Sequence, residues 1–173
     1  YVPEPALEPQ RVTSVKRAKI PAIDGHAHLR DVAAAGGEAV DKLVRQMDDV
    51  NIKSIINLGG AKDVSNDYEV MHTLKSRYPD RFYHLCTIPF NEIVCDEKVG
   101  KSGAAYVKKM WDHGADGLKV FKSLGLTVRD TKGELLMPSD ERLKPLWEEC
   151  AKLDIPVLYH IADPKAFFRP VDS

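Results

Sequence analysis

Several features that would mark other classes of protein are scarce in this sequence. Its three cysteines, Cys86, Cys95 and Cys150, lie far apart and form no CxxC pair, which excludes a zinc knuckle and a thioredoxin-like redox pair. No apolar run approaches the ~20 residues of a membrane-spanning helix. The 25 basic and 26 acidic residues nearly balance, and no cluster of lysine and arginine forms a basic face. We therefore expect neither nucleic acid nor a membrane among the partners.

What is present is the composition of a globular domain. The chain has 173 residues, of which 43% are apolar and 29% are charged, so most of it is expected to fold as one domain. Residues 1–18 contain three prolines and are interpreted as an N-terminal extension, with the domain over residues 19–173. The sequence begins at Tyr1, so the compartment stays open: cytoplasmic, or periplasmic or secreted if an N-terminal signal was removed.

Short apolar runs alternate with helical patterns along the domain. The runs cover residues 18–24, 54–58, 82–88, 117–121 and 156–161 and predict five strands. The patterns between them predict helices; Gly114 is expected to end the third, and Pro145 to lie in the first turn of the fourth. Strict alternation predicts a parallel α/β sheet with right-handed crossovers. Two architectures fit: an open, five-stranded doubly wound sheet, or a (β/α)8 TIM barrel of which this chain holds the first five strands. Length alone favours the open sheet, because such barrels usually need ~250 residues.

The first run ends in the pattern Asp-Gly-His-Ala-His, which contains His26 and His28. Two histidines at positions i and i+2 of a strand share one face, and the carboxyl ends of parallel strands are where α/β enzymes place their sites. Neutral imidazoles at this spacing can bind one divalent metal ion. Two further residues hold comparable places: His160 ends the fifth run, and Lys119 lies in the fourth. Surface histidines and a structural ion pair of Lys119 are the alternatives.

This combination resembles the amidohydrolase superfamily, whose members are metal-dependent (β/α)8-barrel enzymes, and its amidohydrolase-related branch in particular. The resemblance covers residues 19–173. It implies that His26, His28 and His160 bind one or two metal ions, with zinc the default and manganese tolerated. Lys119 matches a strand-four lysine that is a carboxylated metal bridge in binuclear members.

The resemblance also suggests the substrate contacts. It implies that Arg30 grips a substrate carboxylate, unless it is an ordinary loop charge. Lys122 beside the fourth run, and Asn91 and Asp163 after the third and fifth runs, are further candidates for substrate binding, because loops at these ends carry specificity. The family pattern also needs a histidine after strand six and a general-base aspartate after strand eight, which we expect in a segment that follows residue 173.

The expected function is a metal-dependent hydrolase, in which metal-activated water attacks an amide, ester or lactone-like bond of a small anionic substrate. Three alternatives stay open. One is a metal-dependent decarboxylase of the same superfamily, and another is a phosphoesterase that also opens with a His-x-His pair. The third is a non-enzymatic α/β module that binds a ligand or partner. A homo-oligomer is compatible with the sequence but is not marked by any feature of it.

Overall fold

The computed structural model describes residues 14–59, 66–90 and 93–161. Its strands are β1 (Ala22–Ala27), β2 (Ile52–Leu58), β3 (Phe82–Thr87), β4 (Gly117–Val120) and β5 (Val157–Tyr159). Its helices are α1 (Arg30–Ala34), α2 (Gly37–Val50), α3 (Asp67–Arg77), α4 (Val99–Asp112) and α5 (Lys144–Lys152), with a 3-10 turn, η2 (Glu141–Leu143), before the last. No helix in these ranges is long and apolar enough to cross a membrane.

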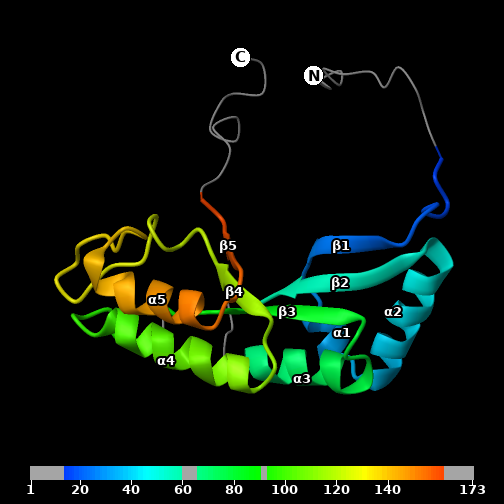
Figure 1. Ribbon diagram of the computed structural model, residues 1–173, viewed down its shortest axis with the longest axis horizontal. Coiled ribbons are helices and arrows are strands. Elements are labelled where there is room, and N and C mark those ends of the chain that lie inside the picture. Colours follow the sequence, from blue (N-terminus) through cyan, green and yellow to red (C-terminus); the bar gives the residue numbers. More distant parts are fainter. Residues whose placement is uncertain (1–13, 60–65, 91–92, 162–173) are drawn as a thin grey trace, which may run out of the picture.

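The order of the strands decides between the two expected architectures. All five are parallel and lie in chain order, β1-β2-β3-β4-β5. A doubly wound sheet reverses its strand order at a switch point and carries helices on both faces. Here the order never reverses, so right-handed crossovers place the helices on one side of a curled sheet (Figure 1). The fold is therefore the first part of a (β/α)8 barrel, and the alternative of an open doubly wound sheet is wrong.

Local signals for helix ends agree with the structure. Gly114 follows α4 with a φ of 101°, in the left-handed region that favours glycine. Pro145 lies in the first turn of α5, where its missing N–H costs no helical hydrogen bond. Val40, Val44 and Met47 form the buried stripe of α2.

The ends of the predicted elements needed two corrections. The first strand begins at Ala22, not at residue 18, because Pro21 has no N–H to give to the sheet, and it runs on to include His26. The helix α1 was not predicted. It has only five residues and buries one side chain, Ala33, which is too little to produce a helical period.

The two faces of the sheet have different surroundings. Ile55 and Phe82 are paired in register, and both are buried beneath α2 and α3. Leu118 and Cys86, also paired, lie in a second cluster with residues of α4 and α5. The opposite face is the inner face of the barrel. Its side chains on the outer strands are exposed among the described residues, as Ile23 on β1 (59%) and Leu158 on β5 (37%) show. The strands are therefore buried on both faces mainly in the middle of the sheet.

Candidate metal and substrate site

The two histidines of the first motif lie at the carboxyl end of β1. Ala27 pairs with Asn57 of β2 and packs into the cluster under the helices. Because side chains alternate along a strand, its neighbours His26 and His28 face the inside of the barrel. Their ring centroids are 5.4 Å apart, with the planes at 75°.

Four of the sequence-predicted residues come together around this point. The pKa of His26 is lowered, first by burial and then by the positive charges of Lys119, His28 and His160, while Asp24 opposes the shift. These interactions bring the ends of β1, β4 and β5 within electrostatic reach of one imidazole. A lowered pKa favours the neutral ring, which is the form that binds a metal ion.

Each of the other two histidines is oriented by its surroundings. Nδ1 of His28 lies 3.1 Å from the carbonyl oxygen of Leu58, so it is the nitrogen that carries hydrogen, and Nε2 is left for a ligand. The backbone N–H of His160 donates to Val120. Its ring packs edge-on against Phe121, with centroids 5.6 Å apart.

Lys119 is buried on the inner face, where it is only 4% exposed. Burial lowers the pKa of its ammonium, with no charged neighbour contributing to the shift, so the structural ion pair considered from the sequence finds no support among the described residues. Thr87 is paired with Lys119 across β3 and β4. The hydroxyl of Thr87 is buried and has no hydrogen-bond partner among the described residues. A buried cation on the inner face suits the binding of a carboxylate.

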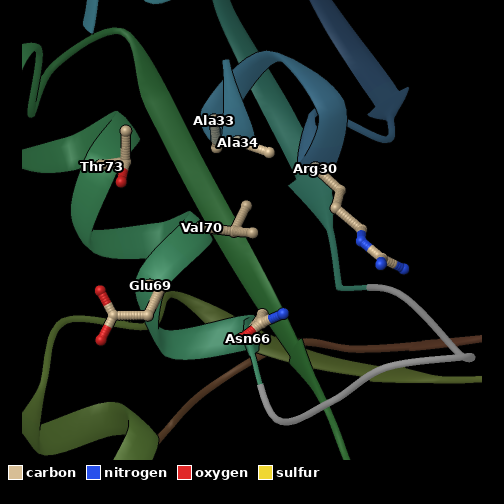
Figure 2. A pocket seen from close by; sticks show the side chains of 7 residues that line it. All are labelled: Arg30, Ala33, Ala34, Asn66, Glu69, Val70 and Thr73. Carbon is tan, nitrogen blue, oxygen red and sulfur yellow. The ribbon is translucent and has the colours of Figure 1, made fainter. Parts of the chain in front are cut away.

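The four remaining candidates lie elsewhere or outside the described residues. Arg30 begins α1 and lines a cavity of about 260 Å³ between α1 and α3, whose apolar wall includes Ala33 and Val70. Figure 2 shows its side chain extending away from α1 on the side of Asn66. Lys122 lies with Nζ 6.0 Å from the centroid of the Phe121 ring. Asn91 and Asp163 lie outside the described residues.

The donor set fits a divalent metal ion in its chemistry but is incomplete in the described part of the chain. Three imidazoles share the inner face, and the orientation of His28 leaves Nε2 available. Across residues 14–59, 66–90 and 93–161, however, no three His, Cys, Asp or Glu side chains are grouped closely enough to hold an ion. Further ligands, or a rearrangement of these side chains, are therefore needed to complete a site.

Sequence analysis missed a buried polar network behind β1. Asn57 on β2, His84 on β3 and Asp67 at the start of α3 are all buried and joined by hydrogen bonds. Asn57 and His84 are polar residues inside otherwise apolar strands, which marks them as unusual in the sequence. The sequence does not show which partners they contact.

Comparisons with known proteins show the fold. No protein-family model matches the sequence, and no curated protein matches it at a significant level. Among solved structures, 2,6-dihydroxybenzoate decarboxylase from Rhizobium is similar with a TM-score of 0.58 and 18% identity, over 86% of this chain and 51% of that one. A 5-carboxyvanillate decarboxylase from Novosphingobium aromaticivorans, with bound manganese, has a TM-score of 0.56 and 12% identity, over 91% of this chain and 56% of that one. The 4-oxalomesaconate hydratase from Rhodopseudomonas palustris has a TM-score of 0.57 and 13% identity, over 81% of this chain and 52% of that one.

These similar structures are enzymes of the amidohydrolase superfamily, the group that the His-x-His motif resembles. This chain spans about half of the length of each of them. At 12–18% identity the likeness establishes a shared half-barrel fold.

Proposed function

We propose that this chain, which has the fold of the first half of an amidohydrolase-superfamily barrel, supplies metal ligands and a carboxylate-binding lysine to a metal-dependent decarboxylase of small aromatic acids. The observation that carries the proposal is the convergence of His26, His28, His160 and Lys119 on one inner surface. The fold supports it, because two of the similar structures are decarboxylases of hydroxylated or methoxylated aromatic acids.

Different residues of this inner surface have different roles in the proposed site. His26, His28 and His160 would hold the ion; manganese and zinc both accept imidazole ligands. A divalent ion in this place supplies positive charge for substrate oxygens. Lys119 binds the substrate carboxylate, and its burial keeps that attraction from being screened by water. Phe121 and Leu158 offer apolar surface to an aromatic ring.

Two further parts of the proposal concern residues outside this inner surface. We propose that a further ligand and the general acid or base come from strands that follow β5 in the full-length protein. Arg30 and Lys122 are proposed to meet the substrate at the mouth of the barrel, together with Asn91 and Asp163.

Hydrolysis is the second candidate reaction, because the motif fits it as well as it fits decarboxylation. The pattern that ends in His26 and His28, followed by Lys119, resembles the hydrolases of the superfamily as much as its decarboxylases. In that case an ion held by the three histidines would supply the activation of water that hydrolysis of an amide, ester or lactone needs near neutral pH, and Lys119 would hold an anionic group of the substrate.

Metal content and product analysis of the full-length protein test both candidates. We expect close to one or two equivalents of manganese or zinc by elemental mass spectrometry, and loss of that metal in His26→Ala and His28→Ala. Incubation with 2,6-dihydroxybenzoate and related hydroxybenzoates should release CO2, whereas amide and lactone substrates test hydrolysis by acid release. Unchanged metal content in both folded variants would contradict the proposed site.

A further inference from the structure

A continuous line of buried hydrogen bonds runs behind the His-x-His end of β1. The side-chain oxygen of Asn57 accepts the backbone N–H of Leu29 at 2.7 Å. Its amide nitrogen lies 2.8 Å from Nδ1 of His84, and Nε2 of His84 lies 3.1 Å from a carboxylate oxygen of Asp67. The three side chains are between 0% and 4% exposed.

The direction of every hydrogen bond in this line is determined. A backbone N–H can only donate, so Asn57 must turn its oxygen to Leu29 and its NH2 to His84. Nδ1 of His84 is therefore an acceptor without hydrogen, and Nε2–H donates to the carboxylate of Asp67. One arrangement satisfies all donors and acceptors, which makes the line rigid.

The line ends on the residues that flank the candidate ligand His28. Asn57 holds the N–H of Leu29, the next residue after His28, while Leu58, the next residue after Asn57, holds Nδ1 of His28 through its carbonyl oxygen. Two consecutive residues of β2 thus fix both the backbone and the ring of this turn. The backbone after His28 and the ring of His28 are therefore both held by β2.

The Asp67 end of the line is also held in place by neighbouring residues. The second carboxylate oxygen of Asp67 accepts the N–H of Thr87 at 2.9 Å, which ties the carboxyl end of β3 to the same group. Gly59 leaves room for this contact. A Cβ at position 59 would lie 2.7 Å from Asp67 and 2.6 Å from the hydroxyl of Thr87.

Packing alone does not explain a polar line in this place. The same face of β2 and β3 carries Ile55, Phe82 and Cys86, all buried in the apolar clusters. Apolar residues at 57 and 84 would extend those clusters, and replacing a buried polar group together with its partners is often neutral or stabilising. The polar line instead holds the backbone that follows β1, at His28 and Leu29, in one orientation.

We propose that Asn57, His84 and Asp67 are positioning residues that orient His28 for metal binding. The inference rests on the proposed function, in that it takes His28 to be a ligand. It assigns to the three side chains a role in metal affinity that exceeds their role in stability. Partners that orient metal-binding histidines typically change metal affinity by 10- to 100-fold when they are removed.

The test compares metal affinity and stability in matched variants of the full chain. Asn57→Ala removes both contacts of the amide. Asn57→Asp keeps an acceptor for Leu29 N–H, and His84 can then donate from both ring nitrogens. Ser54→Ala is the control, since it removes a buried polar side chain from the same strand at a distance from its carboxyl end. The Kd for Zn²⁺ is measured by competition with a chromophoric chelator, and the Tm of each metal-free protein is measured alongside.

We expect Asn57→Ala to weaken Zn²⁺ binding by 10-fold or more, Asn57→Asp to recover most of the affinity, and Ser54→Ala to leave it unchanged. If Asn57→Ala does not fold, His84→Gln, which keeps an amide acceptor for Asn57, provides the second test with an expected loss of at least 3-fold. A lowered Tm with unchanged Kd in the Asn57 variants overturns the inference while the proposed function stands. Absence of Zn²⁺ binding in the unsubstituted protein contradicts the proposed function itself.

Discussion

Lys119 carries a long side chain with an ammonium group on the inner face, and burial alone lowers its pKa. In the folded state the charged form is disfavoured relative to the unfolded chain, so this group subtracts from stability at neutral pH. That penalty falls as the pH rises from the lowered pKa towards 10.5. A residue that costs stability and lines the candidate site is expected to be retained for binding.

Lys119→Met tests this at the level of one side chain. The substitution keeps the length and removes the charge, so we expect the free energy of unfolding at pH 7 to stay equal or to rise. Binding of benzoate, measured by calorimetry, should weaken by about 10-fold or more, because a charge-assisted hydrogen bond contributes roughly 1.5–3 kcal/mol. Lys108→Met, which removes an exposed lysine from α4, is the control. A large loss of stability in Lys119→Met would show that the ammonium has a structural partner.

A second residue-scale prediction concerns Asp140, which caps η2. Hydrogen bonds from the Arg142 side chain, more than any other cause, lower the pKa of Asp140 to about 2. The stability that this interaction contributes is therefore complete above the unfolded pKa of 3.8 and is lost as the pH falls towards 2.

Asp140→Asn keeps the cap and removes the charge. We expect it to unfold more easily at pH 7, by about 1–2 kcal/mol after allowance for partial exposure, and to match the unsubstituted protein near pH 2. Urea unfolding at pH 7, 4 and 2 measures the difference. A gap between the two proteins that is the same at every pH would contradict the assignment of the effect to the ion pair.

At the scale of elements, a glycine allows close contact between α4 and the 3-10 turn η2 that precedes α5. A Cβ at Gly100 would lie 2.0 Å from the carbonyl oxygen of Arg142, whereas at Gly103, one turn further along α4, the nearest atoms of Leu146 would be 3.5 Å away. The first distance requires the backbone to move, and the second is ordinary contact. The two glycines are in the same helix, so helix propensity affects them alike.

The pair gives a matched prediction. Gly100→Ala should lower the free energy of unfolding by about 1–3 kcal/mol, because forced overpacking outweighs the gain in helix propensity. Gly103→Ala should be neutral or stabilising by up to about 1 kcal/mol. Chemical denaturation of both variants measures the two values. Equal effects would show that α4 does not approach the backbone of η2 this closely.

At the scale of the whole molecule, the sheet has two unpaired edges among the described residues. β1 pairs only with β2, and β5 only with β4. Apolar side chains at both edges, Ile23, Val157 and Leu158, are exposed. Open edges and exposed apolar faces promote association between chains.

A polypeptide of these 173 residues alone should therefore self-associate. We expect its mean mass in sedimentation velocity to rise between 5 and 100 µM, and Leu158→Lys to reduce that rise by placing a charge on the inner face of β5. Tyr83→Lys, which changes an exposed residue of the central strand β3, is the comparison. A monodisperse monomer at 100 µM would show that the described surface is covered by the chain itself.

The sequence by itself determined the succession of strands and helices, because buried parallel strands and amphipathic helices leave separate apolar periods. It also determined the positions of His26, His28, Lys119 and His160 at strand ends, and it set the ends of α4 and α5 through Gly114 and Pro145. These are local properties, readable within a few residues of each position.

Only the tertiary structure decided the order of the strands, and with it the choice of a barrel over an open sheet, because both architectures share one succession of elements. It alone joined Asn57, His84 and Asp67, since contacts between β2, β3 and α3 leave no period in the sequence. It also placed Arg30 beside α3 and buried Lys119 on the inner face with no ion-pair partner among the described residues. Pairing between distant segments is a property of the folded chain, and the polar network and the inner surface both depend on it.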